Sequence, residues 1–191
     1  MKEKVHFSPV ILDPNTPWPR LYLSHDLTSV GHGNVWQPLP NNPERNMEYA
    51  NIFGSEGFSS GKHSWEVEVG DHPLWNVGFV KESTERKGKR NPSPINGVWC
   101  LLHQDKEYKT GFAQILKVKK NPQKIRVQLD YEGGEVSFYD AEDMSHIYTY
   151  RDFFTEDFFT EKLFPYLDVG KAGDAKTTEL KICKEQIRSS M

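Results

Sequence analysis

The sequence has few cysteines and no long apolar run. Its longest strongly apolar stretch is the five residues from Val98 to Leu102, whereas a helix that spans a bilayer needs about 20. The two cysteines, Cys100 and Cys183, are too few for a disulfide-stapled secreted scaffold. No apolar segment follows the charged start at Met1 to Lys4, as it would in a secretion signal. These absences predict a cytoplasmic chain with reduced thiols and no membrane span.

No charge of one sign dominates the chain. Lys and Arg number 24 against 27 Asp and Glu, which gives a formal net charge of -3. A nucleic-acid backbone requires a basic surface, so a nucleic-acid partner is not expected. The charge is uneven, because residues 81–90 hold five basic side chains and residues 117–126 hold five without an acid. Such runs usually lie on solvated faces, although they can also steer a ligand or partner.

Motifs for catalysis and metal binding are missing. Gly57 to Gly61 matches Gly-x-Ser-x-Gly, but a strand-like segment follows Ser59 where a nucleophile elbow needs a helix. The seven histidines are scattered, and Cys100 and His103 are predicted on opposite faces of one strand, whereas zinc needs convergent ligands. No complete dinucleotide or phosphate loop is present. We therefore expect no enzyme activity, no metal site and no cofactor.

Period-two alternation is the dominant pattern that is present. Apolar side chains alternate with polar ones over residues 64–69, 75–79, 124–129, 135–138 and 180–182. This alternation is typical of strands with one buried face. The glycines between residues 130 and 135 predict a hairpin, and the best helical candidate, residues 155–162, spans two turns at most. The sequence predicts an all-β fold, an antiparallel sandwich or barrel.

The five tryptophans divide into two groups. Trp65, Trp75 and Trp99 fit the alternation and are predicted in the core. Trp18 lies between two prolines and Trp36 in a polar, glycine-bearing stretch, so a partner could reach both.

An ordered set of motifs covers most of the chain. The motifs are Leu12-Asp13-Pro14, Leu21-Tyr22-Leu23-Ser24, Asn42-Pro43-Glu44-Arg45, the run from Gly54 to His63, Trp65-Glu66-Val67-Glu68-Val69, Trp75-Asn76-Val77-Gly78, the run from Leu129 to Gly134, Val136-Ser137-Phe138-Tyr139 and Leu163-Phe164-Pro165. From about Val5 to Cys183 the chain resembles a PRY-SPRY domain, the carboxy-terminal module of many tripartite-motif ubiquitin ligases, butyrophilins and some fish NOD-like receptors.

The resemblance implies one domain over residues 1–191 with a concanavalin-like fold. This fold is a bent β-sandwich of two antiparallel sheets, with a PRY part at residues 5–55 and a SPRY part at residues 56–183. Residues 184–191 lack apolar anchors and are expected to fray.

The resemblance also implies a non-catalytic module whose loops recognise a target protein. The corresponding loops are residues 28–47, 81–96, 102–108 and 166–174. In a tripartite-motif parent the target is the substrate of the ubiquitin ligase, often in innate immunity. No RING-type zinc pattern or heptad run is present, so ligase activity and self-association are expected to come from segments outside this chain.

The family also suggests which residues bind. In its antibody-binding member, an acid, two tryptophans and a phenylalanine make the contact, and the matching positions here are Glu82, Leu102, Gln104 and Leu167, so both tryptophans are absent. The residues expected to contact a target protein are Trp36, Glu82, Arg86, Arg90, Leu102, Gln104, Tyr166 and Leu167. Butyrophilins of one group bind phosphoantigens in a basic pocket, and comparable segments here hold Lys87, Arg90 and Lys109. An anionic small-ligand sensor and the carboxy-terminal domain of an NOD-like receptor are therefore alternative interpretations.

Overall fold

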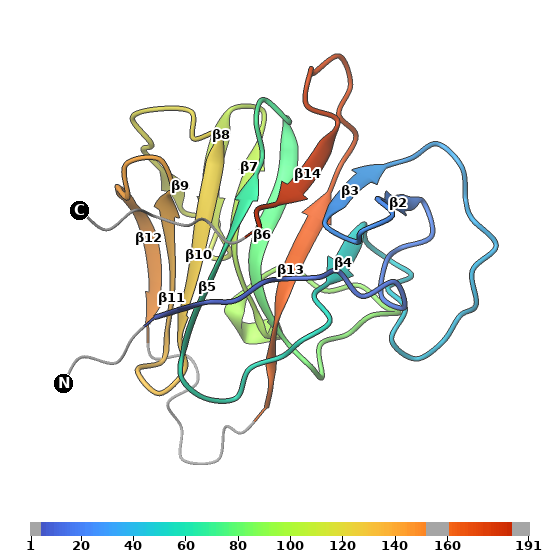
Figure 1. Cartoon of the computed structure of the whole chain (residues 1–191), viewed down its shortest axis with the longest axis horizontal. Helices are drawn as coiled ribbons and strands as arrows, with labels where there is room; N and C mark the ends of the chain where they lie inside the picture. Colours follow the sequence, from blue (N-terminus) through green and yellow to red (C-terminus); the bar gives the residue numbers. More distant parts are fainter. Residues whose placement is uncertain (1–4, 152–160, 185–191) are drawn as a thin grey trace.

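Two β-sheets stack face to face in the computed structural model, which describes residues 5–151 and 161–184 (Figure 1). The eight-stranded sheet has the order β12-β11-β10-β5-β14-β3-β2, with β1 paired to β5, and the six-stranded sheet has the order β4-β13-β6-β7-β8-β9. The strands are β1 (His6–Phe7), β2 (Leu21–Leu23), β3 (Ser29–His32), β4 (Asn51–Phe53), β5 (Lys62–Glu68), β6 (Leu74–Lys81), β7 (Val98–Gln104), β8 (Glu107–Thr110), β9 (Ile115–Leu116), β10 (Lys124–Asp130), β11 (Glu135–Asp140), β12 (His146–Arg151), β13 (Leu163–Val169) and β14 (Glu179–Ile182).

The predicted fold class is confirmed. All strand pairs are antiparallel except β1 with β5. The predicted hairpin is formed by β10 and β11, whose pairing runs from Ile125 with Asp140 to Asp130 with Glu135. One short 3-10 helix, η1 (Pro94–Asn96), precedes β7. Most of the predicted helical segment 155–162 and of the predicted frayed tail 184–191 lies outside the described residues.

The core lies between the two sheets and contains the predicted tryptophans. Trp65, Trp75 and Trp99 are at most 2 % exposed and pack with the inward side chains of both sheets. The alternation predicts solvated side chains on the other face of β5, but Ser64 and Glu66 on that face are buried. Segments from both ends of the chain run alongside this strand, since the backbone N–H of Ser8 donates to the Ser64 carbonyl and that of Cys183 to the Glu66 carbonyl.

Strands from residues 5–55 complete both sheets. In the eight-stranded sheet β3 pairs with β14, and in the six-stranded sheet β4 pairs with β13. Leu12, Val30 and Ile52 are fully buried in the shared core. Residues 5–55 and the rest of the described chain are therefore interleaved in one sandwich.

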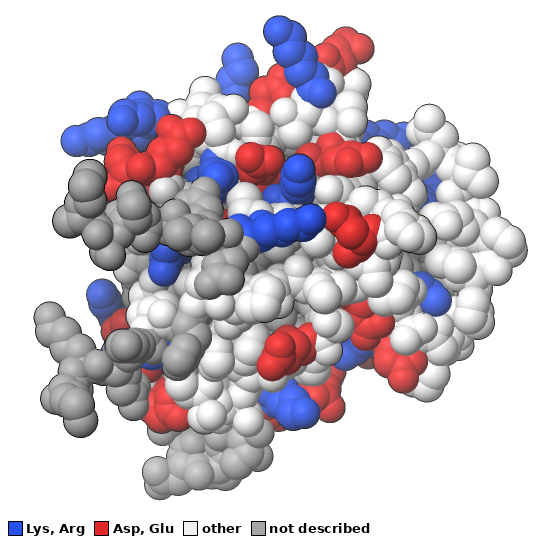
Figure 2. All heavy atoms as spheres, viewed as in Figure 1, with Lys and Arg blue, Asp and Glu red and all other residues white. Residues whose placement is uncertain are grey.

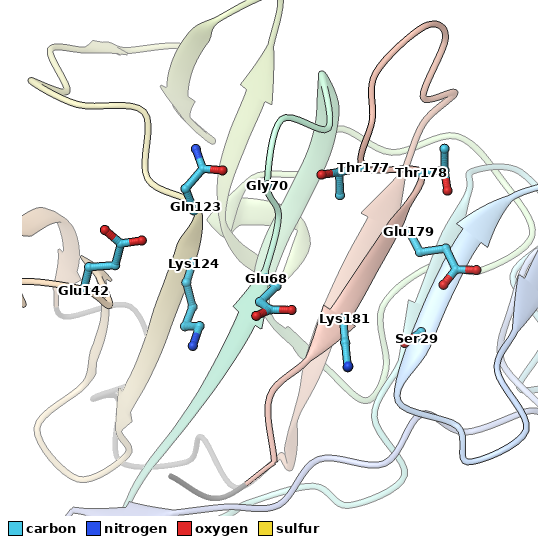
Figure 3. Close-up of a pocket in the computed structure, with 10 residues that line it drawn as sticks. All are labelled: Ser29, Glu68, Gly70, Gln123, Lys124, Glu142, Thr177, Thr178, Glu179 and Lys181. Carbon is cyan, nitrogen blue, oxygen red and sulfur yellow. The ribbon is translucent and has the colours of Figure 1, made fainter.

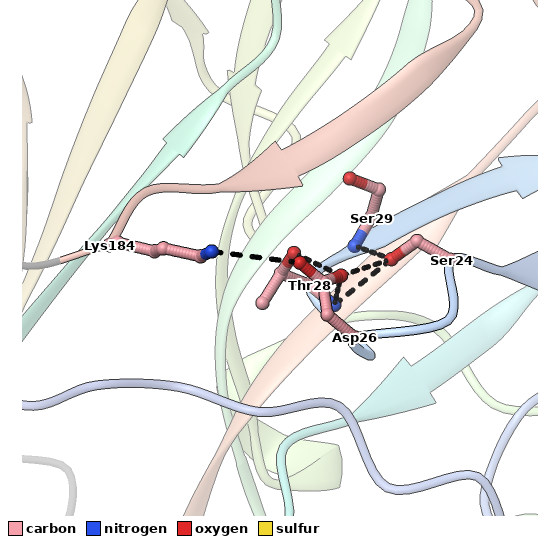
Figure 4. A network of polar contacts seen from close by, with 5 residues as sticks. All are labelled: Ser24, Asp26, Thr28, Ser29 and Lys184. Carbon is pink, nitrogen blue, oxygen red and sulfur yellow. Dashed lines mark hydrogen bonds and ion pairs between the residues drawn. The ribbon is translucent and has the colours of Figure 1, made fainter.

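A polar network holds the turn between β2 and β3 (Figure 4). Asp26 Oδ1 accepts hydrogen bonds from the Ser24 hydroxyl at 2.7 Å and from the Thr28 hydroxyl at 2.7 Å. Lys184 Nζ lies 3.8 Å from Asp26 Oδ2. The hydrogen bonds from Thr28 and Ser24, ahead of the weaker attraction of Lys184, lower the pKa of Asp26 to about 2.

The loop between β6 and β7 covers part of the outer face of the six-stranded sheet. Beneath it lies a second apolar cluster that includes Phe53, Val80, Cys100 and Tyr166. The Cys100 thiol contacts the Pro92 carbonyl at 3.9 Å, which ties the loop to β7. Both cysteines are free. In the described part of the chain no helix is long and apolar enough to cross a bilayer.

Candidate functional site

A row of side chains crosses all six strands of the smaller sheet on its outer face. The register pairs Asn51 of β4 with Asp168 of β13, Asp168 with Asn76 of β6, Asn76 with Leu102 of β7, Leu102 with Lys109 of β8, and Lys109 with Ile115 of β9. Paired residues on neighbouring strands point to the same face, so these six side chains lie on one face of the sheet, where Asn51 itself is fully buried. We call this row the outer-face row.

The β4 end of the row is a polar centre. Asn51 Nδ2 donates to Asp168 Oδ2 at 2.7 Å, while Arg90 NH2 donates to Asn51 Oδ1 at 2.7 Å. The amide of Asn51 therefore bridges the cation and the carboxyl. Asn76 hydrogen-bonds to Tyr166, whose buried hydroxyl also accepts a long bond of 3.4 Å from Asn51 Nδ2. These contacts fix the orientation of polar groups at one end of the outer-face row.

The Asp168 carboxyl is the titratable group of this centre. The side chain keeps some exposure at the face, but protein atoms surround the carboxyl. Burial raises its pKa to about 7, while attraction by Arg90 and the hydrogen bond from Asn51 act in the opposite direction. Because burial disfavours the charged form, the carboxyl exchanges its proton near neutral pH.

The basic side chains of the β6–β7 loop fasten that loop to residues 41–45. Arg86 lies over the Phe53 ring at 4.8 Å and donates to the carbonyls of Glu44 and Glu82. Lys87 Nζ donates to the Asn41 side chain and to the carbonyls of Asn42 and Arg45, at 2.6 to 2.8 Å. These cations hold two loops together, which the run of basic residues in the sequence does not reveal.

The Arg90 side chain is buried and held by hydrogen bonds within the protein. It is 9 % exposed, and its Nε donates to the Thr84 hydroxyl and to the Glu85 carbonyl. Its guanidinium is thus engaged by the loop and by Asn51, so the expectation that Arg90 is presented to a partner is wrong. The guanidinium fixes the position of Asn51, and its attraction acts to lower the pKa of Asp168, against the effect of burial.

Tyr166 and Leu167 also correct the sequence analysis. The family resemblance places them in a loop over residues 166–174, but β13 continues to Val169, and the two residues are 1 % and 0 % exposed. Tyr166 packs in the second apolar cluster and Leu167 in the core between the sheets. Neither side chain is available to a target protein in this structure.

The other predicted protein-binding residues are more accessible. Gln104 and Glu82 are exposed, and Leu102 is partly buried in the outer-face row. Leu102 and Gln104 belong to strand β7 rather than to a loop. Trp36 is 46 % exposed and makes an edge contact with Trp18 at 5.8 Å. That these four side chains bind a partner stays a prediction.

The three predicted anion-binding side chains are not brought together. Arg90 contacts Asn51 on β4, whereas Lys109 lies on β8, four strand spacings away, or roughly 19 Å at about 4.8 Å per strand. Lys109 Nζ lies 3.2 Å from Glu107 Oε1, and the ammonium of Lys87 is engaged by residues 41–45. A joint basic pocket built from Lys87, Arg90 and Lys109 is therefore not formed.

Sequence analysis missed the polar centre. Asn51, Asn76 and Asp168 are 25 to 117 residues apart in the chain, and each looks like an ordinary strand or turn residue. The available signal was their position between apolar neighbours in strand-like segments, where a polar side chain must face outward. Which outward positions share a row depends on strand order, which alternation does not determine.

The outer face of the larger sheet carries mixed charge. A 530 Å³ hollow lies there, and Lys124, Glu68 and Lys181 occupy paired positions on β10, β5 and β14 (Figure 3). Figure 2 shows basic and acidic side chains interleaved on this face, with fewer of either around β2 and β3. Opposite charges side by side create little net field, so nothing here selects an ionic partner. Among residues 5–151 and 161–184, no group of three or more His, Cys, Asp or Glu side chains is arranged to hold a metal ion.

Comparisons of the sequence with known proteins identify one family. Residues 62–181 match the family described as SPRY domain, and residues 10–58 match the SPRY-associated domain, PRY. The chain is 46 % identical to "Nuclear factor 7, ovary" of Xenopus laevis over 88 % of this chain and 28 % of that protein. It is 44 % identical to "E3 ubiquitin-protein ligase TRIM58" of Mus musculus over 76 % of this chain and 31 % of that protein. It is also 44 % identical to "Butyrophilin subfamily 2 member A2" of Homo sapiens over 76 % of this chain and 28 % of that protein.

A solved structure supports the same fold. The "Crystal structure of TRIM65 PSpry domain" superposes with a TM-score of 0.77 at 20 % identity, over 97 % of this chain and 99 % of that one. The chain spans less than a third of the length of each of the three relatives above.

Proposed function

Because the chain belongs to the PRY-SPRY family, whose domains are non-catalytic protein-interaction modules, we propose that it recognises a target protein through the outer-face row. The observation that carries this proposal is the row of partly exposed side chains Asp168, Asn76, Leu102 and Lys109 on neighbouring strands, with the buried Asn51 fixing its polar end. A few well-placed anchors rather than total area determine the affinity of such a surface.

We propose further that the parent protein is a tripartite-motif E3 ubiquitin ligase and that this domain selects its substrate. Support comes from the similarity to TRIM58, which is described as an E3 ubiquitin-protein ligase and of which this chain matches 31 %. A cytoplasmic location belongs to the same proposal, and the two free cysteines are compatible with a reducing compartment. The butyrophilin-like alternative of an anionic ligand has less support, because its three basic residues do not converge.

Charged substitutions on the two outer faces test the binding surface. Lys109→Glu and Leu102→Arg alter the outer-face row, while Lys181→Glu makes a matched change on an exposed strand position of the larger sheet. Affinity capture from cells followed by quantitative mass spectrometry is expected to show one set of partners lost with the first two variants and retained with Lys181→Glu. If partners are retained with Lys109→Glu and Leu102→Arg, this face is not the binding surface.

The ligase assignment needs the complete parent protein. Ubiquitylation of the captured partner is expected to decrease with Leu102→Arg and to persist with Lys181→Glu. If partner binding is lost but ubiquitylation of that partner is never observed, the domain is an interaction module without the proposed ligase role.

A further inference from the structure

The hollow on the outer face of the larger sheet has the volume of a ligand site. It measures 530 Å³, within the range of about 300–1,000 Å³ for small-molecule pockets. Gly70 belongs to its lining, and a Cβ added there would collide with the Thr177 side chain, so this position contributes no side chain to the hollow. The hollow and the outer-face row lie on opposite sides of the sandwich, because each occupies the outer face of its own sheet.

A row of alternating charge crosses the hollow (Figure 3). The register pairs Lys124 of β10 with Glu68 of β5, and Glu68 with Lys181 of β14. Lys181 is paired in turn with Ser29 of β3. Neighbouring strands are about 4.8 Å apart, and paired side chains point to the same face of a sheet. An ammonium, a carboxylate, a second ammonium and a hydroxyl therefore follow one another across the sheet.

The charged groups of this row are available to a ligand. Glu68 and Lys181 are exposed and Lys124 is half-buried. Within the described ranges, no ion pair shorter than 4.0 Å and no side-chain hydrogen bond engages the Glu68 carboxylate or either ammonium. The Ser29 hydroxyl points away from the polar network of the β2–β3 turn (Figure 4). A ligand can therefore bind these groups without first breaking a contact of the fold.

An aromatic ring borders the hollow on the side of β2. Tyr22 of β2 is paired with Gly31 of β3, and Gly31 is paired with Glu179 of β14, which lines the hollow. A Cβ on Gly31 would collide with the Tyr22 ring, so the ring lies across this glycine toward β14. Burial and the negative charge of Glu179 raise the pKa of Tyr22, as expected for a ring beside that carboxylate. The Tyr22 side is 39 % exposed, so part of the ring is open to a ligand.

This arrangement favours an uncharged ligand with many hydroxyls. Each hydroxyl can donate and accept, so neighbouring hydroxyls of one ring can donate to Glu68 and accept from a lysine beside it. Hydrogen bonds to charged groups are stronger than those between neutral groups. An anion that approached the two lysines would meet the Glu68 carboxylate between them, so the row does not select a charged ligand. The exposed part of Tyr22 provides an apolar surface for the C–H groups of a sugar ring.

We propose that the hollow binds an uncharged disaccharide, with one ring hydrogen-bonded to Glu68 and to the lysines beside it and the other ring against Tyr22. Glu68 on β5 and Gly31 on β3, beneath the Tyr22 ring, are two strand spacings apart, or roughly 10 Å at about 4.8 Å per strand. Two linked sugar rings cover this distance, whereas a single ring does not. The disaccharide can be a free sugar or the end of a glycan.

NMR of the nitrogen-15-labelled full chain tests the proposal. The backbone amide signals of Glu68, Lys124 and Lys181 are expected to shift in a saturable manner with at least one of maltose, cellobiose, lactose and sucrose at millimolar concentration. Tetrahydropyran-2-methanol, which lacks the ring hydroxyls, and inorganic phosphate are the controls and are expected to cause no saturable shift. Absence of such shifts with all of these disaccharides, or equal shifts with phosphate, would overturn the proposal.

A glycopeptide distinguishes the two sources of the ligand. It is neutral and ends in the disaccharide that binds most tightly. Equal affinity for the glycopeptide and the free disaccharide is expected, because the hollow is open on the sheet face, and would assign the end of a glycan as the ligand. Weaker binding of the glycopeptide would assign a free sugar.

Variants provide the second measurement. Glu68→Gln retains the shape of this exposed side chain and is expected to weaken disaccharide binding about tenfold by calorimetry, through the loss of a charge-assisted hydrogen bond. Glu107→Gln makes the same change on β8 of the smaller sheet and is expected to bind like the native chain. Undiminished binding by a folded Glu68→Gln protein contradicts the assignment; should that variant not fold, the titration of the native chain decides.

Lys181→Glu separates this site from protein recognition. It places a second acid beside Glu68 and is expected to abolish disaccharide binding, while the partners of the outer-face row are retained. Disaccharide binding that survives Lys181→Glu would contradict the row of alternating charge as the binding site, whatever the outcome for the protein partners.

Discussion

At the scale of single residues, the protonation of Asp168 in the outer-face row is expected to make the stability of the fold depend on pH. Its pKa is raised to about 7 from the usual 3.8, so the folded state favours the protonated form. The resulting contribution to stability is fully present below about pH 4 and is lost as the pH rises through 7. We expect Asp168→Asn to remove this part of the pH dependence.

Urea unfolding at several pH values between 4 and 8 measures this effect. The native chain is expected to lose stability relative to Asp168→Asn over that range, whereas the exposed Asp174→Asn is the control and tracks the native chain. If the unfolding free energies of the native chain and of Asp168→Asn change with pH in parallel, the carboxyl ionises as it does in water.

Two tryptophans, one buried and one exposed, allow the effect of burial on stability to be measured for the same type of side chain. Trp65 is 1 % exposed and makes an edge contact with Phe79 at 6.5 Å, while Trp36 is 46 % exposed. Trp65→Ala leaves a large cavity and is expected to cost about 3–5 kcal/mol of unfolding free energy. Trp36→Ala is expected to cost less than about 1 kcal/mol. Thermal and chemical denaturation measure both, and similar losses would contradict the assigned burial.

At the scale of elements, the β2–β3 turn depends on one carboxylate. Hydrogen bonds lower the pKa of Asp26 to about 2, so its ionised form stabilises the fold. This stabilisation is present above the unfolded pKa near 4 and is lost as the pH falls through 2. The stability difference between the native chain and Asp26→Asn is therefore expected to shrink in acid. Denaturation between pH 2 and 6 measures it, and a constant difference would rule out this role for the carboxylate.

Alternation predicted the long strands well but not the strand that contains a proline. Residues 124–130 and 135–140 alternate cleanly, and the structure pairs them as predicted. The family resemblance places Tyr166 and Leu167 in a loop, but β13 continues to Val169. Pro165 lies within this strand, opposite Phe79 of β6, although proline lacks a backbone donor and is uncommon inside strands.

Long-range partners explain the other errors in the candidate site. Arg90 contacts Asn51, 39 residues away, and Lys87 contacts Asn41, 46 residues away. Nothing in a local basic run distinguishes a solvated lysine from one whose ammonium is engaged by another loop. Leu102 and Lys109 were selected individually from family resemblance, and their positions in one row follow only from strand order.

At the scale of the whole molecule, the interleaved sheets predict that the PRY and SPRY parts fold together. Removing residues 1–55 would expose the edges of β13 and β14 and much of the core. We expect residues 56–191 alone to be unfolded or aggregated, and the full chain to unfold in one transition. Circular dichroism and calorimetry measure both, and a soluble, cooperatively folded fragment would show that the single-domain prediction is wrong.

The attachment between the β6–β7 loop and residues 41–45 has a consequence for how such a surface can diversify. Three of the acceptors that anchor Arg86 and Lys87 are backbone carbonyls, at Asn42, Glu44 and Arg45. A carbonyl is retained whichever side chain the position carries. Substitutions along residues 42–44 can therefore change what a partner meets while the two loops stay fastened, so that new specificities arise without a loss of the scaffold beneath them.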